Sequence, residues 1–242
     1  LNGHRLGVGD RPHAAGAQLA RLVTEFEKGL EELRGTVRAA PIGYSIAASN
    51  TVLHWLLLPK IKAISAALPS VKWALHHEST AGIGEKVAMG QIDFGLCIGT
   101  PSTATLKKRF LGIVEYGLFA PTSLGSATDA AKVLSEFPLA LPVGGNLRVS
   151  LDIWAKKEKI DLNMRLEIDS YLQAADAVIR GTHAAVLPTL VATSMPKEVR
   201  SIPLPAAVAQ RRKLWLLWTE RLLRTRSAAA DVRDVLVRHV AV

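Results

Sequence analysis

From residue 41 onward, the apolar residues follow two alternating patterns: short runs of strand length, and longer segments in which they recur at helical spacing. The short runs predict strands at 42–48, 71–78 and 92–98. The helical spacing predicts helices at 51–68 and 82–90 between these strands. Because right-handed crossovers connect the strands of such a βαβαβ unit, we expect them to form a parallel sheet.

A second set of elements follows a long predicted strand at 110–120. It consists of helices at 128–136, 147–158 and 172–180 and strands at 139–142, 164–168 and 184–187. The chain then ends with predicted strands at 199–204 and 213–219 and an amphipathic helix at 227–240. The two sets indicate two similar α/β lobes, with the chain passing between them more than once. Such lobes enclose a cleft, and ligands bind in clefts of this kind beyond the carboxyl ends of the strands.

Before the first strand, the chain carries a short heptad pattern. Its apolar positions, at spacings of 4, 3, 4 and 3, are Leu19, Val23, Phe26, Leu30 and Leu33. Charged residues lie between them, and Gly35 follows the last one. This seam predicts a helix that dimerises with its own copy.

The most informative polar positions are Ser49, Asn50 and Thr51, which lie where the first strand gives way to a helix. The free N–H groups of a first helical turn and the positive end of the helix dipole favour a polar or anionic group at such a place. The alternative is that Ser49 or Asn50 only caps the helix, which is the commonest role of these residue types.

Composition limits the class of protein. The chain has 242 residues, 49% of them hydrophobic, which is enough for one or two packed domains. Its longest apolar run, at 52–58, is far shorter than the roughly 20 residues that span a bilayer, so we expect a soluble protein with no membrane partner. Cys97 is the only cysteine, which excludes a disulfide framework and favours a cytoplasmic location. No signal peptide is visible, and because the first residue is Leu1 we expect a fragment whose true N-terminus lies upstream.

The formal net charge of +9 raises the question of nucleic-acid binding. The basic residues outside the first forty gather at 107–109, 156–157, 211–213 and 221–226, without interleaved aromatic residues. This distribution is typical of solvated faces and predicts a general attraction for anions rather than a nucleic-acid surface.

Catalytic patterns are missing from the sequence. His76 and His77 are adjacent on a predicted strand, so they point to opposite faces and cannot share a metal ion. We interpret Asp93 as a hydrogen-bonding residue that shapes a turn. No GxSxG, HExxH or phosphate-loop motif occurs, so we predict no catalytic residue, metal or cofactor.

At this level of detail the sequence resembles the LysR-type transcriptional regulators. The end of that family's wing and its linker helix are similar to RPHAAGAQLARLVTEFEKGLEELRG. Its first lobe is similar to SNTVLHWLLLPKIKAISAALPSVKWALHHESTAGIGEKVAMGQIDFGLCIG, and later motifs are similar to GTHAAVLP and LWLLW. The resemblance implies an α/β, two-lobed, type 2 periplasmic-binding-protein-like fold with Rossmann-like lobes and an N-terminal linker helix.

The resemblance also implies a domain organisation and a function. Residues 1–13 would be a remnant of the DNA-binding wing, 14–35 the dimerising linker helix and 36–242 the effector-binding regulatory domain. Its first lobe would comprise about 41–112 and 206–242, and its second lobe about 113–205. The expected function is the effector-binding and oligomerisation part of a DNA-binding transcriptional regulator, acting as a homodimer or homotetramer. DNA would be bound through the missing N-terminal domain.

The effector contacts implied by the resemblance follow the strand ends of both lobes. They are Ser49, Asn50, Thr51, Ser79, Thr80, Gly99, Thr100, Asn146 and Ser170. For Ser79, Thr80 and Asn146 a helix-capping role is an equally good interpretation. His183 stands where the family usually has a second glycine, which places a titratable side chain beside the cleft as a wall residue or an effector contact. The positive balance and the helix-start donors favour a small carboxylate or another anion as effector.

Two other classes use the same two-lobed fold. A solute-binding protein of a transport system would share the cleft, but it should carry a signal sequence and lack the heptad helix. An enzyme is the remaining alternative, because fold alone does not decide function.

Overall fold

The computed structural model describes residues 22–23, 25–26, 41–99 and 105–242. The chain divides into two units, Leu1–Ile42 and Gly43–Val242, which are described separately. The described residues 22–23 and 25–26 of the first unit are helical. The predicted wing remnant, the rest of the linker helix and the predicted contact Thr100 lie outside the described residues.

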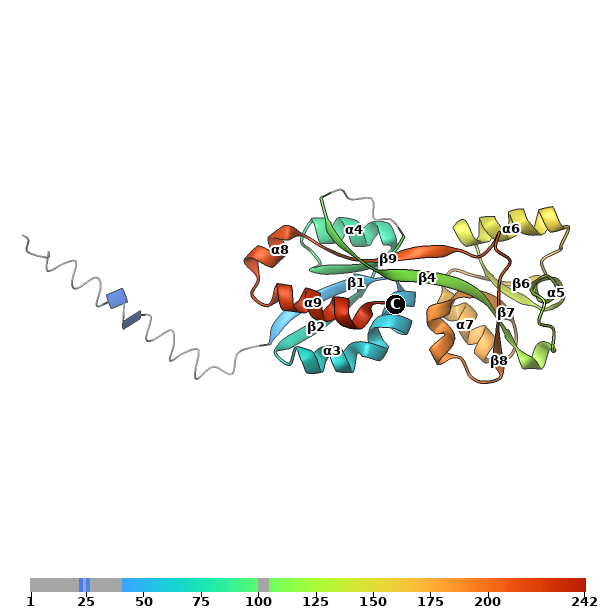
Figure 1. Ribbon diagram of the computed structural model, residues 1–242, viewed down its shortest axis with the longest axis horizontal. Helices are drawn as coiled ribbons and strands as arrows, with labels where there is room; N and C mark the ends of the chain where they lie inside the picture. The colour runs from blue at the N-terminus through green and yellow to red at the C-terminus, as the bar shows by residue number, and fades with distance from the viewer. Residues whose placement is uncertain (1–21, 24, 27–40, 100–104) are drawn as a thin grey trace, which may run out of the picture. The chain divides into compact units, whose positions relative to one another are not determined.

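The first lobe of the second unit is built on three neighbouring strands, in the order β2 (Val71–His77), β1 (Ile42–Ala48) and β3 (Phe94–Ile98). Strands β1 and β3 are parallel, with Ile46 opposite Phe94, as the crossover rule predicts. Helix α4 (Thr80–Ala88) connects β2 to β3 and covers one face of this sheet (Figure 1).

The helix predicted at 51–68 has the expected extent but not a uniform geometry. It begins as α2 (Asn50–Val52), widens to a π-helix at Leu53–Leu57, tightens to a 3₁₀ turn at Leu58–Lys60 and ends as α3 (Ile61–Ala67). Pro59 provides the physical reason, because proline has no N–H to donate and its ring clashes with the carbonyl four residues earlier in an α-helix.

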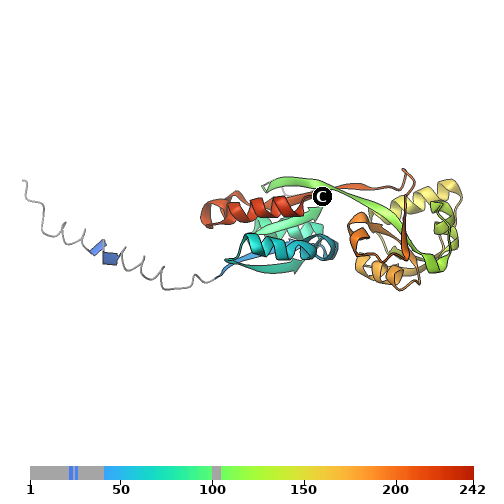
Figure 2. The ribbon, with the colours of Figure 1, turned by 60° about the horizontal axis from the view of Figure 1, so that its bottom comes forward.

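Two long strands connect the lobes (Figure 1, Figure 2). The first part of β4 (Lys107–Pro121) is antiparallel to β9 (Arg211–Trp218), and its later part pairs with β7 (Ala184–Pro188) and β8 (Val199–Ile202). The pairing partner changes between Glu115 and Tyr116. The two segments in which the chain passes between the lobes, β4 and β9, are therefore neighbours in the sheet.

The second lobe surrounds β5 (Leu139–Pro142), β6 (Met164–Ile168) and β7. Its helices are α5 (Ala130–Glu136), α6 (Asn146–Glu158) and α7 (Tyr171–Ile179). Neighbouring residues of β4 point to opposite faces of this sheet, because side chains alternate along a strand. Leu118 packs with α5 and α6, whereas Phe119 packs with α7.

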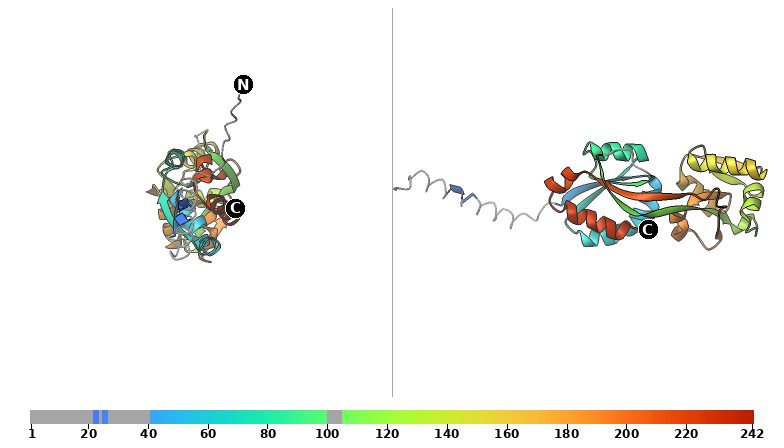
Figure 3. Two further views of the ribbon diagram at one scale, coloured as in Figure 1. Left: turned by 90° about the vertical axis from the view of Figure 1, so that its left-hand side faces the viewer. Right: turned by 45° about the horizontal axis from the view of Figure 1, so that its top comes forward.

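The chain ends on the first lobe. A short helix that the sequence did not reveal, α8 (Glu220–Thr225), precedes α9 (Ala229–Val240). Helix α9 packs beside α3, on the sheet face opposite α4 (Figure 3). Among the described residues, no helix is both long enough and apolar enough to cross a membrane.

One side chain of the first lobe belongs to the core of the second. Trp55, in the π-helical segment, is only 6% exposed and packs in a cluster with Phe119, Ala174 and Val178. The helix that follows β1 is therefore anchored in the second lobe as well as the first.

Candidate functional site

A cavity of about 650 Å³ lies at the carboxyl ends of β1, β2 and β3 and extends to the start of α7 in the second lobe. Its lining residues are Ser49, Asn50, Thr51, His77, Thr80, Ile98, Tyr116, Asp169, Ser170, Tyr171, Leu172, Gln173 and Arg212. This volume is within the usual range for small-molecule sites. The cavity is where the sequence predicts the cleft, and it brings together five of the predicted contacts, namely Ser49, Asn50, Thr51, Thr80 and Ser170.

Two of these five contacts also act as helix caps. The Ser49 Oγ accepts a hydrogen bond from the Val52 backbone N–H at 3.5 Å, and the Ser170 Oγ accepts one from the Leu172 N–H at 3.3 Å. A capping hydroxyl orients the start of its helix, so that the neighbouring free N–H groups point beyond the helix end. Capping and lining are therefore compatible at these positions.

Thr51 differs from these caps. It is 8% exposed and is the only buried polar residue among those that the structure describes. Thr51 lines the cavity, and its hydroxyl forms no hydrogen bond with any described residue. A hydroxyl without an internal partner in a cavity wall can donate to, or accept from, a ligand, so Thr51 is suited to a partner inside the cavity.

Arg212 is the cationic residue of the cavity, although the sequence pattern placed it in one of the solvated basic clusters. It lies on β9 opposite Val114, beside the point where β4 changes partners. No carboxylate in 41–99 or 105–242 lies within ion-pair distance of its guanidinium. Arg212 shares a strand face with the buried Leu214 and Leu216, and a charged residue on a buried face is the signal that could have revealed it.

Two tyrosines lie close to this guanidinium. The rings of Tyr116 and Tyr171 are 5.8 Å apart between centroids. Burial raises the pKa of both hydroxyls, and the nearby Arg212 charge acts in the opposite direction. The phenols are therefore neutral hydrogen-bonding groups at physiological pH, and Arg212 supplies positive charge to this part of the cavity.

The other predicted contacts lie elsewhere in the described structure. Ser79 caps α4, its Oγ accepting from the Gly82 N–H at 3.1 Å. Asn146 is exposed and is the first residue of α6, with Gly145 rather than Asn146 at the cap position. The His183 Nδ1 lies 2.9 Å from the Thr182 Oγ1. Gly99 does not line the cavity, but it lies against the Arg212 side chain.

Metal binding and thiol chemistry have no support in the described part of the chain. No group of three or more His, Cys, Asp or Glu residues there could hold a metal ion. Cys97 is buried, and burial raises the pKa of its thiol to about 11. A protonated, inaccessible thiol is a poor nucleophile.

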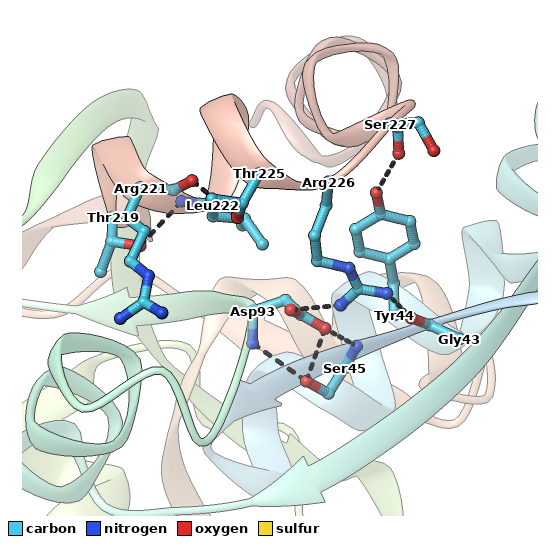
Figure 4. Close-up of polar contacts among 10 residues, drawn as sticks. All are labelled: Gly43, Tyr44, Ser45, Asp93, Thr219, Arg221, Leu222, Thr225, Arg226 and Ser227. Atoms are coloured by element: carbon cyan, nitrogen blue, oxygen red, sulfur yellow. Dashed lines mark hydrogen bonds and ion pairs between the residues drawn. The ribbon is translucent and has the colours of Figure 1, made fainter. Parts of the chain in front are cut away.

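A second cavity, of about 440 Å³, lies between the end of α4 and α8. Its main charged pair is already satisfied (Figure 4). Asp93 accepts hydrogen bonds from the Ser45 N–H at 2.8 Å, the Ser45 hydroxyl at 2.9 Å and the Arg226 guanidinium at 2.6 Å. The Arg226 guanidinium also stacks over the Tyr44 ring, whose hydroxyl donates to the Ser227 carbonyl at 2.6 Å. This cluster fastens the end of α8 to the sheet and confirms Asp93 as a hydrogen-bonding residue.

Solved structures with the same fold include three transcriptional regulators. Full-length CbnR in a complex with its target DNA has 15% sequence identity and a TM-score of 0.64, with 94% of this chain and 81% of that chain covered. A full-length variant of OxyR from Pseudomonas aeruginosa has 18% identity and a TM-score of 0.65, with coverages of 95% and 81%. The regulatory domain of MexT, a transcriptional activator in Pseudomonas aeruginosa, has 17% identity and a TM-score of 0.67, with coverages of 82% and 100%. These similarities establish the two-lobed fold.

The comparison of sequences gives the family. A search of curated proteins finds no significant match. The family model of the LysR substrate binding domain matches residues 44–241, which is most of the chain and includes every residue of the cavity between the lobes. The chain therefore belongs to the LysR substrate binding domain family.

Proposed function

We propose that this chain is the sensing part of a LysR-type transcriptional regulator and that it binds a small carboxylate in the cavity between its lobes. The observation that carries the proposal is that the cavity is lined by Thr51, the one buried polar residue of the described chain, together with the cationic Arg212. Arg212 supplies the positive charge that a carboxylate needs, and hydrogen bonds to a charged group are stronger than those between neutral groups. Of the predicted contacts, we assign direct effector binding to Ser49, Asn50, Thr51, Thr80 and Ser170.

The cavity geometry suggests how binding becomes a signal. A ligand that touches Thr51 in the first lobe and the α7 start in the second favours the arrangement in which both contacts form. The ligand can shift the equilibrium between the open and closed arrangements of the lobes only by as much as its affinities for the two arrangements differ. Trp55 lies one helical turn after Thr51 and packs in the second-lobe cluster, so displacement of this helix start would act on both lobes.

The output would pass through subunit contacts to a DNA-binding domain upstream of the present sequence. We propose a homodimer or homotetramer, held together in part by the helix that carries Val23 and Phe26. The similarity to CbnR, which was solved with its target DNA, supports this role. The family match and the regulators named above make a transport protein or an enzyme less suitable interpretations.

A thermal-shift screen of small carboxylates, with the wild type and Thr51→Val side by side, tests the proposal. Thr51→Val removes the hydroxyl and nearly preserves the shape of the side chain. Loss of one hydrogen bond to a charged ligand costs about 1.5–3 kcal/mol, or roughly 10- to 100-fold in affinity. Thr51→Ser keeps the hydroxyl and serves as the matched control. A hit that stabilises the wild type and Thr51→Val equally would show that Thr51 is not a contact.

A further inference from the structure

Two residues of opposite charge line the cavity between the lobes. Among the lining residues, Arg212 is the only lysine or arginine and Asp169 is the only aspartate or glutamate. Arg212 comes from β9, and Asp169 lies directly before Ser170, the cap of α7 in the second lobe. Neither side chain forms an ion pair with a described residue, so the two are also more than 4.0 Å from each other.

We infer that the ligand carries an ammonium group as well as a carboxylate and is a free α-amino acid or a close analogue. This inference rests on the proposed function and specifies the class of carboxylate. An exposed carboxylate at the cavity wall repels a ligand that is only anionic, whereas it attracts an ammonium group. A zwitterion satisfies both unpaired charges, and a simple carboxylate satisfies only one of them.

The positions of the two charges assign the two ends of the ligand. Thr51 lies at the helix start after β1 in the first lobe, and Arg212 lies on β9, one of the two strands that connect the lobes. We assign the carboxylate to these two residues. Asp169 binds the ammonium group from the second lobe. Its backbone N–H is bonded to the Gln173 Oε1 at 3.3 Å, which fixes the loop without using the Asp169 carboxylate. The amino group is therefore the part of the ligand that engages the second lobe through charge.

Calorimetric titration with matched ligands tests this inference. The probes are the proteinogenic L-amino acids and the 2-oxo acids with the same side chains, which keep the carboxylate but lack the ammonium group. We expect at least one amino acid to bind the wild type at least 10-fold more tightly than its 2-oxo acid. Asp169→Asn should reverse this preference, and Arg212→Gln should weaken both ligands. Asp161→Asn, which removes an exposed carboxylate outside the cavity, should change neither affinity.

The outcomes separate this inference from the proposed function. If a 2-oxo acid binds the wild type as tightly as its amino acid, and Asp169→Asn leaves both affinities unchanged, the zwitterion is excluded while the carboxylate site stands. If no amino acid binds, the inference is overturned. If no member of the wider carboxylate screen binds either, the proposed function fails with it.

Discussion

Arg226 donates a hydrogen bond from Nη1 to the Asp93 Oδ1 at 2.6 Å, and this contact joins the end of α8 to the turn before β3. The two side chains are 33% and 15% exposed, so solvent screens the pair only in part. Asp93 also holds Ser45 of β1 through two hydrogen bonds. A single carboxylate thus connects three segments that are far apart in the sequence.

Removal of this carboxylate should destabilise the first lobe. Asp93→Ala removes the acceptor of the Ser45 N–H and hydroxyl and leaves Arg226 with only the Gly43 carbonyl as acceptor, so we expect the free energy of unfolding to fall by about 2–3 kcal/mol. Urea denaturation measures this change. Asp176→Asn breaks an exposed pair with Arg180 on α7 and should leave stability unchanged within error. Equal effects of the two substitutions would show that the Asp93 cluster is not a structural clamp.

Gly99 should control the position of Arg212. A Cβ on Gly99 would lie 2.8 Å from the Arg212 Nη2, and the residue has a φ of +108°. Gly99→Ala should therefore displace the guanidinium and weaken carboxylate binding at least 10-fold. Gly90→Ala is the matched control, because Gly90 has a φ of +71° and no atom lies within 4 Å of the added Cβ. It should cost about 1 kcal/mol of stability and leave calorimetric affinity unchanged. Unchanged affinity in Gly99→Ala would contradict the role of Arg212.

Cys97 should make stability fall at alkaline pH. Its folded-state pKa is about 11, against an ordinary value of 9.0, so the unfolded chain loses the thiol proton first as the pH rises. Unfolding is then favoured progressively between about pH 9 and pH 11, by on the order of 2–3 kcal/mol in total. Cys97→Ala lacks this contribution, so its stability should decline less than that of the wild type over the same range. Parallel pH profiles in urea denaturation would contradict the shift.

The helix before the regulatory domain should mediate association. The described apolar side chains Leu22, Val23 and Phe26 are 57%, 51% and 68% exposed in the single chain. We expect a dimer at tens of micromolar in sedimentation velocity, weakened by Phe26→Lys because a charge would enter the seam. Glu25→Lys, on the charged side of the same turn, should have a smaller effect. A wild-type monomer at this concentration would exclude the proposed seam.

Periodicity in the sequence identified most elements because each buries one face. The strands around Ile46 and Phe94 and the alternation at Leu118 and Phe119 follow directly from apolar spacing. The short α8 carries too few residues for a periodic signal. The π-helical segment at Leu53–Leu57 places Trp55 in the second-lobe cluster, a long-range contact that apolar spacing within the segment does not predict.

The candidate site was predictable only in its local parts. Ser49 to Thr51 and Ser170 each follow a strand and start a helix, so their roles are visible in a short window. Arg212 and Asp169 reach the same cavity through the crossing strands and the second lobe, which are distant in the sequence. Long-range packing therefore determines which charged residues line the cavity. The local sequence pattern around Arg212 predicts a solvated basic cluster, because it contains no information on this packing.

Hydrogen–deuterium exchange of the wild type, with and without the most stabilising carboxylate at saturation, tests the central claim most directly. A ligand between the lobes should slow exchange of the backbone amides after Ser49 in the first lobe and after Ser170 in the second, in the same experiment. Peptides around the cavity at Met89 and Arg221 should show no change. Protection in only one lobe, or protection centred on the α8 cavity, would contradict a ligand site that spans the two lobes.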